Sequence, residues 1–342
     1  MNLKTKITQL HYDRNAKGAF VSLLEFCSYF YGFGSGLKNW LYDKKILRPQ
    51  KVNAYVISVG NMTTGGVGKT PVVLEIARYL IKKGERVAIV SRGYGGKLPN
   101  KNVNVISDGE NTFYTAAMAG DEPFMLAQKA QGVCVLTCKN RYKAAKFAVE
   151  KLGVTKIILD DGFQHRKFHR DLDIVLMDSK MGLGNEKLLP AGPLREGAEA
   201  LERIDKLVVV SKNTDHSKAE KFAKIMQKRL SIETQLCYTE PDYIYNIKTG
   251  ELLDEGETVT AICAIGQPQQ FFDFLGPYSV KDTIALDDHH QYSPIDLVDI
   301  EGNIVTTEKD AVKLLRFDKD NIYALKLRTT IDVERLLDVK KG

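Results

Sequence analysis

The sequence has few cysteines and no long uninterrupted apolar run. Its 342 residues include five cysteines, which are scattered through apolar segments and do not form a disulfide framework, so we expect a reducing compartment. Hydrophobic residues make up 44% and charged residues 27%, which excludes wholesale disorder and fibrous classes. Basic residues exceed acidic ones only slightly, 49 against 43, for a formal charge of +6. So mild and spread a charge predicts no nucleic-acid partner, but it suits an anionic substrate or a membrane surface.

The N-terminal residues lack the features of a secretory signal, because no apolar stretch begins within the first dozen positions. Residues 19–33 read AFVSLLEFCSYFYGF, but Glu25 interrupts this stretch and glycines end it. It is therefore shorter than the roughly 20 apolar residues of a membrane-spanning helix. Basic residues flank the stretch, and Trp40 follows it, a pattern typical of a helix at a membrane interface. A helix packed on the protein's own core fits the same residues, and the pattern leaves both interpretations open.

Short β-branched runs alternate with helical stretches over much of the chain. The expected strands are residues 55–59, 86–90, 133–136, 156–159, 173–177 and 206–210. The expected helices between them are residues 72–83, 124–130, 139–151 and 217–230. Continuous apolar strands separated by helices predict an α/β fold with a mostly parallel sheet and helices on both faces.

The pattern changes after about residue 235. Strand-like residues 258–265 and 321–327 and helical residues 269–275, 308–315 and 331–339 indicate a second, smaller α/β lobe. Strand-like residues 234–247 would join it to the first. The predicted organisation is an N-terminal membrane-associating segment at 1–48, a core at 49–233, and linker strands with the smaller C-terminal lobe at 234–342.

A glycine-rich turn follows the first expected strand, in the sequence SVGNMTTGGVGKTP. A strand, such a turn and then a helix are the layout of a phosphate-binding P-loop, and they predict a P-loop NTPase-like core that binds ATP and Mg²⁺. Lys69 would reach the β- and γ-phosphates, and the Thr70 hydroxyl would ligate Mg²⁺. The strict motif has glycine where Thr63 stands, and the glycines cluster further along. The predicted nucleotide-binding residues are Thr63, Thr64, Gly65, Gly66, Val67, Gly68, Lys69 and Thr70.

A second polar cluster follows the strand expected at residues 156–159. Asp160 and Asp161 come at its end, where a carboxylate reaches the ligand-binding edge of a parallel sheet. One of the two would ligate Mg²⁺ and the other would orient water or a neighbour, although a strand-capping turn fits the same Asp-Asp-Gly. Gln164 and His165 follow in a loop, where catalytic groups concentrate. Arg92, Arg141 and Arg195 are further candidate phosphate contacts.

Seven segments of the chain, in this order, resemble the tetraacyldisaccharide 4′-kinase family of the lipid A pathway. They are SVGNMTTGGVGKTP (58–71), SRGYGG (91–96), GDEP (120–123), DDGFQHRKFHRD (160–171), LPAGPLRE (189–196), DDHHQY (287–292) and GNIVTTEKDAVKL (302–314). The resemblance runs from about Ala19 to Leu315. It implies a phosphotransferase that uses MgATP to phosphorylate the 4′-hydroxyl of a tetraacylated glucosamine disaccharide 1-phosphate, giving lipid IVA and ADP. It also implies a monomer held peripherally at the cytoplasmic face of the inner membrane by an N-terminal helix.

The resemblance assigns roles to individual residues. Asp121 matches the acidic residue thought to accept or orient the acceptor's proton, and His289 matches the histidine that pairs with it from the second lobe. The doubled His289-His290 leaves open which imidazole faces Asp121. Asp287 departs from the small or proline residue expected there. The residues that match the metal and active-site cluster are Asp160, Asp161, Gln164 and His165.

Other interpretations stay open at this point. Asp121 precedes an expected helix and would also serve as a helix cap. A P-loop switch ATPase of the partitioning or maturation-factor type shares the GGxGKT loop, and it would hydrolyse ATP without a lipid acceptor. A non-catalytic peripheral membrane protein with a vestigial P-loop is a third possibility. Lys69, Thr70 and the Asp160-Asp161 pair are all intact, which argues against it.

Overall fold

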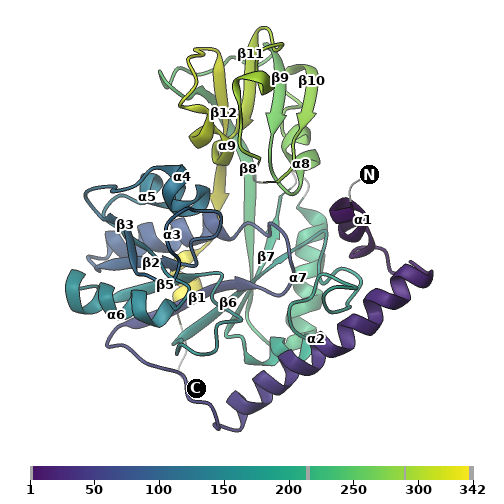
Figure 1. The fold of residues 1–342 in the computed structure, drawn as a ribbon, viewed down its shortest axis with the longest axis vertical. Helices are drawn as coiled ribbons and strands as arrows, with labels where there is room; N and C mark the ends of the chain where they lie inside the picture. The colour runs from purple at the N-terminus through teal and green to yellow at the C-terminus, as the bar shows by residue number, and fades with distance from the viewer. Residues whose placement is uncertain (1–2, 213–215, 289, 339–342) are drawn as a thin grey trace.

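A single sheet runs through the molecule. The computed structural model describes residues 3–212, 216–288 and 290–338, and among them twelve strands pair in the order β10-β9-β11-β12-β8-β7-β6-β1-β5-β2-β4-β3 (Figure 1). The strands are β1 (Tyr55–Asn61), β2 (Val87–Ser91), β3 (Asn104–Asp108), β4 (Cys134–Thr137), β5 (Lys156–Asp160), β6 (Leu172–Asp178), β7 (Lys206–Ser211), β8 (Thr234–Asn246), β9 (Thr258–Cys263), β10 (Ser279–Ala285), β11 (Asn303–Thr307) and β12 (Ile322–Thr330). The α-helices are α1 (Leu3–Leu10), α2 (Ala19–Asp43), α3 (Lys69–Lys82), α4 (Ala116–Ala119), α5 (Asp121–Lys129), α6 (Arg141–Leu152), α7 (Ser217–Leu230), α8 (Pro268–Asp273), α9 (Glu308–Leu314) and α10 (Val333–Leu337).

The core lobe, from β1 to β7 with its helices, confirms the predicted parallel sheet. β1 lies between β5 and β6 and pairs in parallel with both. All seven residues of β6 are buried, as expected of a strand covered on both faces. α3 packs an apolar face that includes Val72, Ile76 and Ala77 into the largest core cluster. One edge of this sheet was not predicted: the edge strand β3 runs antiparallel to β4.

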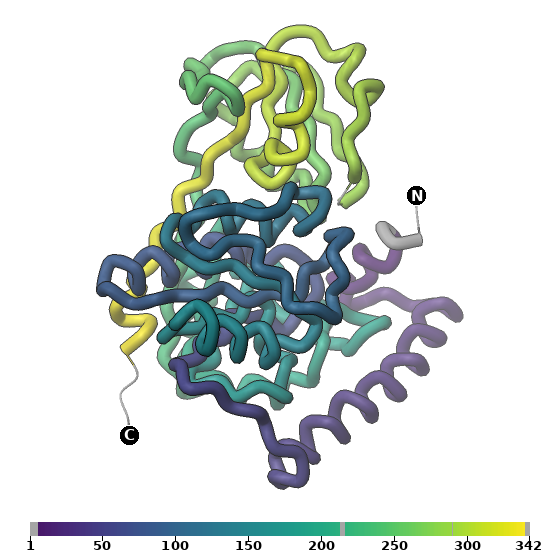
Figure 2. Tube along the Cα trace, turned by 60° about the vertical axis from the view of Figure 1, so that its left-hand side comes forward, coloured from purple at the N-terminus to yellow at the C-terminus, as the bar shows by residue number. Residues whose placement is uncertain are grey.

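One long strand joins the core lobe to the small lobe, which comprises β9 to β12, α8 and α9. β8 pairs in parallel with β7 through Tyr238 and then antiparallel with β12 through Asn246. The predicted division at residue 234 coincides with the first residue of β8, but the hydrogen bonding of the sheet crosses it without a break. Figure 2 shows the small lobe above the core lobe, joined through these strands.

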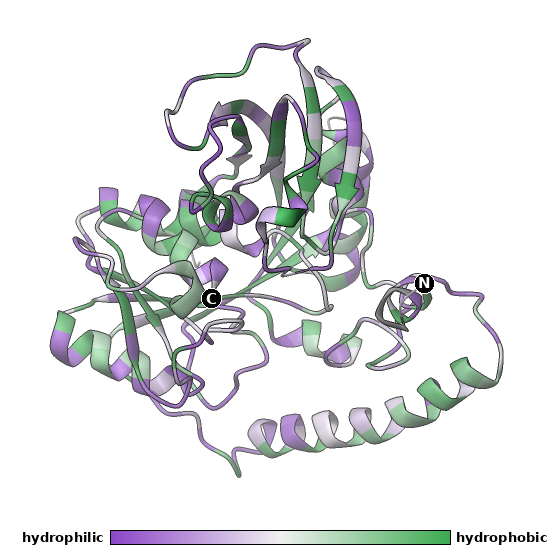
Figure 3. Ribbon diagram, turned by 45° about the horizontal axis from the view of Figure 1, so that its top comes forward, coloured by the Kyte–Doolittle hydropathy of each residue, from purple (hydrophilic) through white to green (hydrophobic). Residues whose placement is uncertain are grey.

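The N-terminal helix α2 runs along one side of the core lobe for 25 residues (Figure 3). Its large apolar side chains Leu23, Phe26, Phe30, Phe33, Leu37 and Trp40 are all exposed; we call them the apolar stripe. They recur at intervals of three and four residues, so they share one face of the helix. Their exposure contradicts the interpretation that these aromatics belong to the protein's own core. Among the described residues, no helix is both long and apolar enough to cross a membrane.

Candidate functional site

The P-loop folds as its sequence predicts. β1 ends at Asn61, and α3 begins at Lys69 after the glycine-rich turn. Gly68 is the N-cap of α3 with a φ of 94°, in the left-handed region that favours glycine, and no side chain caps this end. An uncapped helix N-terminus presents unpaired N–H groups and a positive dipole end, which together bind phosphate.

Asp161 connects the P-loop lysine to Arg195. The ammonium of Lys69 lies 3.3 Å from Oδ1 of Asp161 and donates to Oδ1 of Asn61 at 3.0 Å. Arg195 Nη1 donates to both carboxylate oxygens of Asp161, at 2.9 and 2.8 Å. Burial alone would raise the pKa of Asp161, but Lys69 and Arg195 outweigh it and lower the pKa to about 2. The two cations on either side of Asp161 therefore favour its ionised form.

Arg195 and Gln164 complete this network beside the P-loop. The segment that carries Arg195 is tied to the loop, since the N–H of Thr64 donates to the carbonyl of Pro193 at 2.8 Å. Gln164 donates through Nε2 to the carbonyl of Asn61 at 2.8 Å and accepts from Arg195 at 3.4 Å. The structure thus brings together Lys69, Asp161, Gln164 and Arg195. Asn61, fully buried at the end of β1, is a member that sequence reasoning missed.

Asp160 occupies a different environment from its neighbour. It is the buried last residue of β5, whereas Asp161 lies in the turn that follows, with a φ of 56°. Burial, together with the nearby charge of Glu122, raises the pKa of Asp160 to about 7 against the opposing effect of Lys69. A buried carboxylate that resists ionisation is one that a bound cation would stabilise.

The residues predicted to hold Mg²⁺ fit an ion that arrives with ATP. Within the described part of the chain, no group of three or more His, Cys, Asp or Glu side chains could hold a metal ion. Mg²⁺ in nucleotide sites is typically held by one or two carboxylates together with substrate phosphates. Thr70, at the start of α3, offers a hydroxyl oxygen. Asp160 offers a carboxylate, and Asp161 lies beside it in the chain.

Asp121 makes an ion pair with the other lobe. It is the first residue of α5, and Gly120 is the N-cap, so Asp121 does not cap this helix. Its Oδ2 lies 3.0 Å from Nζ of Lys313 in α9. Lys313 lies in the segment 302–314, whose sequence alone predicts no role for this lysine. Thr307, Asp310 and Lys313 recur at three-residue intervals, which was the available signal for a polar helix face.

The structure answers only in part which of the two adjacent histidines faces Asp121. His289 lies outside the described residues, so its pairing with Asp121 stays a prediction. Nε2 of His290 lies 3.2 Å from Oδ2 of Asp296, so that imidazole faces Asp296.

A basic pocket of about 610 Å³ lies beside Gln164. Its lining residues carry many cations and no carboxylate, and they include Lys38, Arg92, Lys139, Arg141, Lys143 and His165. Burial, with the charge of Arg141 and other nearby cations, lowers the pKa of His165 to about 4. His165 Nε2 and Arg141 Nε are buried without a hydrogen-bond partner among the described residues. Such a pocket fits an anion.

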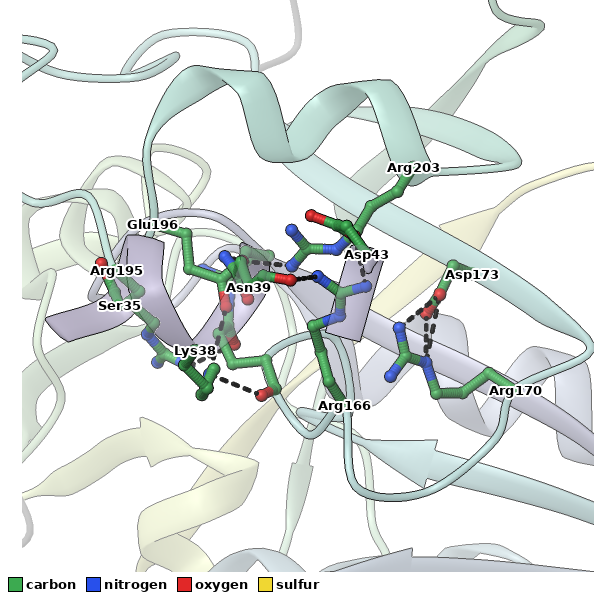
Figure 4. Close-up of polar contacts among 12 residues, drawn as sticks. Ser35, Lys38, Asn39, Asp43, Arg166, Arg170, Asp173, Arg195, Glu196 and Arg203 are labelled. Atoms are coloured by element: carbon green, nitrogen blue, oxygen red, sulfur yellow. Dashed lines mark hydrogen bonds and ion pairs between the residues drawn. The ribbon is translucent and has the colours of Figure 1, made fainter. Parts of the chain in front are cut away.

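The polar side of α2 is attached to the loops of this site (Figure 4). Tyr31 donates to the carbonyl of Arg195 at 2.9 Å, and Lys38 donates to the carbonyl of Gln164 at 3.3 Å. Arg166, two residues after Gln164, pairs with Asp43 at the end of the helix at 2.7 Å. Helix α2 therefore carries the apolar stripe and is also bound to the loops of the candidate site.

Comparison with known proteins identifies the family of the chain. The family model for tetraacyldisaccharide-1-P 4′-kinase matches residues 20–340. Tetraacyldisaccharide 4′-kinases from Syntrophus aciditrophicus and Desulfotalea psychrophila are 37% and 38% identical, over 93% and 87% of this chain and 92% and 89% of theirs. The crystal structure of LpxK from Aquifex aeolicus in complex with ATP is similar with a TM-score of 0.77 and 34% identity, covering 93% of this chain and 97% of that one. This chain belongs to the tetraacyldisaccharide 4′-kinase family.

Proposed function

We propose that this protein transfers the γ-phosphoryl group of ATP to the 4′-hydroxyl of a tetraacylated glucosamine disaccharide 1-phosphate, giving lipid IVA and ADP. The observation that carries the proposal is a complete P-loop, whose Lys69 lies within an ion-paired network with Asp161 and Arg195, in a chain of this family. The family assignment disfavours the switch ATPase that the P-loop alone left open.

The nucleotide side of the reaction uses the N-terminus of α3. Its N–H groups and Lys69 would hold the phosphates, and phosphoryl transfer depends mainly on positioning and charge stabilisation of this kind. Thr70, Asp160 and Asp161 would hold Mg²⁺, which when bound neutralises charge on the transferring phosphate. Arg195 already forms an ion pair with Asp161, which leaves Lys69 available to follow the phosphate.

The acceptor side uses Asp121 at the lobe interface. The 4′-hydroxyl must lose its proton as phosphorus transfers, and a carboxylate within hydrogen-bond reach can accept it. Asp121 lies where core-lobe helix α5 meets small-lobe helix α9. A base at this interface would be correctly placed only when the two lobes are docked. Docked lobes exclude water, so this dependence would limit ATP hydrolysis.

The basic pocket suits the 1-phosphate of the acceptor. That phosphate is the acceptor's anionic group, and Arg141 and His165 present buried atoms that still need hydrogen-bond partners. Arg141 and Arg92 line the pocket, so two of the three arginines suggested by the sequence lie there. Lys38 of α2 also lines the pocket, so the proposed 1-phosphate site would lie beside the helix proposed to meet the membrane.

The apolar stripe of α2 would hold the protein at the cytoplasmic face of the inner membrane as a peripheral monomer. Each methylene of an acyl chain exposed to water costs about 0.8 kcal/mol, so the substrate's chains stay in the bilayer. The enzyme must then work at the surface, through inserted aromatics and through cations that face anionic lipid.

Phosphate transfer from labelled ATP tests this proposal. The protein is incubated with γ-labelled ATP, Mg²⁺ and the disaccharide 1-phosphate in mixed micelles, and label in the lipid-soluble fraction is measured over time. Acceptor-dependent labelled lipid is expected. Release of labelled inorganic phosphate at the same rate with and without acceptor would instead favour the switch ATPase.

A further inference from the structure

The ammonium of Lys313 is almost completely buried, with a side-chain exposure of 4%. A buried ammonium costs several kcal/mol of lost hydration unless each of its donors is matched. Lys313 Nζ has three acceptors for its three N–H groups: Asp310 Oδ1 at 3.4 Å, the carbonyl of His290 at 3.2 Å and Asp121 Oδ2 at 3.0 Å. The first two belong to the small lobe and the third to the core lobe.

The small-lobe acceptors hold the ammonium in a fixed position. Asp310 is fully buried, and its Oδ2 accepts from the N–H of Ala264 at 2.9 Å and from the hydroxyl of Thr307 at 2.8 Å. The ring of Tyr292 lies against the ammonium, with its centroid 5.9 Å from Nζ. A side chain so constrained within its own lobe presents its remaining donor to Asp121 in one geometry.

Two ion pairs of opposite polarity join α5 to α9. Asp121 begins α5 and meets Lys313 near the end of α9, while Lys129 ends α5 and pairs with Glu308, which begins α9. The helices therefore lie antiparallel, one from each lobe, with the acidic partner in the core lobe at one end and in the small lobe at the other. This arrangement sets how α9 docks on α5. Only the pair with Lys313 involves the proposed base.

We propose that Lys313 is a positioning residue for the phosphoryl transfer: it holds the carboxylate of Asp121 in place when the lobes are docked. The inference rests on the role proposed above for Asp121. Lys313 also binds the backbone of His290, the residue that follows the proposed partner His289 in the chain. One ammonium thus connects Asp121 with the small-lobe segment expected to act beside it. When α9 leaves α5, Asp121 loses this contact, so the orientation of the base depends on lobe docking.

The test compares two buried lysines replaced by methionine, which is close in length and volume but uncharged. Lys313→Met removes the contact to Asp121. Lys206→Met is the matched control, because Lys206 has a side-chain exposure of 6% and also pairs with a carboxylate, that of Glu233. Lys206 is the first residue of β7, so it lies at the amino end of that strand and not at the carboxyl edge, where ligands of α/β sheets bind. Both variants are expected to lower the Tm. Only Lys313→Met should lower kcat, by about tenfold or more, with KM for ATP changed by less than about twofold, as expected for loss of transition-state positioning.

A double-mutant cycle shows whether Lys313 acts through Asp121. In an Asp121→Asn background, adding Lys313→Met should change the residual kcat by less than about twofold, because the group being positioned is already lost. Unchanged kcat in Lys313→Met, equal kcat losses in the two lysine variants, or losses that multiply in the double mutant would each overturn the inference. If Lys313→Met does not fold, Asp310→Asn combined with Lys313→Met removes both buried charges and gives the same readout.

The outcomes separate this inference from the proposed function. Full activity of Asp121→Asn would overturn the role of Asp121 whatever Lys313 does. An inactive Asp121→Asn with a fully active Lys313→Met would overturn only the inference about Lys313.

Discussion

The ammonium of Lys69 lies 3.3 Å from Oδ1 of Asp161. The lysine expected to bind the γ-phosphate is therefore held beside one of the two carboxylates proposed to hold Mg²⁺. Arg195 contacts both oxygens of the same carboxylate, so Asp161 keeps a cationic partner when Lys69 turns to the phosphates. This shared carboxylate links nucleotide binding to the loop of residues 189–196, and through Tyr31 to α2.

Replacement of Lys69 by alanine should lower kcat by about a hundredfold or more, because the charge that follows the transferring phosphate is lost. Lys82→Ala is a suitable control, since Lys82 is exposed in the last turn of the same helix. Steady-state kinase assays at saturating ATP measure both. Near-normal activity of Lys69→Ala would mean that this loop is not the ATP site.

Asp121 and His289 are predicted to act as one unit. If so, Asp121→Asn and His289→Gln should each lower kcat by about as much as the double variant, since groups that act together are strongly non-additive. The Kd for ATP should barely change in either single variant. Single losses that simply multiply in the double variant would remove the pair from the mechanism.

The core lobe was predictable because its signals are local. β1 and β5 are continuous apolar runs, and the glycines after β1 demand a turn, so the P-loop and the Asp160 position follow from neighbours in the chain. Not every strand was predicted, and some of those missed lack such runs. β10, for example, lies at a sheet edge with most of its side chains exposed.

The contact between Asp121 and Lys313 could not be read from local patterns. Asp121 lies in α5 of the core lobe and Lys313 in α9 of the small lobe, and they meet only because β8 and β12 carry the chain between lobes. The sequence shows that Lys313 follows Thr307 and Asp310 at a helical spacing. It does not show which carboxylate from a distant segment meets that lysine.

Stability should depend on pH through His165. Its pKa is lowered to about 4 in the folded chain, whereas an unfolded histidine titrates near about 6.5. Between these values the unfolded chain binds more protons, so the contribution is complete above about pH 6.5 and is lost as the pH falls towards about 4. Compared with His165→Gln, the parent protein should lose about 1–2 kcal/mol of unfolding free energy between about pH 7.5 and about pH 5.

Urea unfolding of the two proteins at both pH values measures this difference in unfolding free energy.

Inorganic phosphate in the basic pocket should raise the pKa of His165, because a nearby anion favours the imidazolium form. NMR titration of the imidazole measures this pKa with and without phosphate. A pKa near about 6.5 without phosphate would contradict the cationic environment of the pocket.

Membrane binding should depend on the apolar stripe. Phe26, Phe30 and Phe33 are 60%, 67% and 74% exposed, so their replacement by serine should leave the fold intact. The triple variant should no longer cosediment with anionic liposomes, and its KM for lipid should rise while the Kd for ATP stays constant. High salt should weaken binding of the parent protein only partly, because the apolar contribution is not screened.

A matched control removes as many exposed apolar side chains elsewhere. Ile225, Leu252 and Val298 are 61%, 66% and 64% exposed and lie outside α2. Their joint replacement by serine should leave liposome binding unchanged. Full cosedimentation of the α2 variant, or its unfolding, would show that the stripe is not the membrane contact.

Transfer to the 4′-hydroxyl is tested by comparing two acceptors that differ by one oxygen atom. The disaccharide 1-phosphate and its 4′-deoxy analogue are each incubated with the protein, γ-labelled ATP and Mg²⁺, and labelled lipid is measured. Label should be transferred to the first acceptor, and none should be transferred to the second. Label on the 4′-deoxy analogue, or the absence of labelled lipid with the intact acceptor, would contradict it.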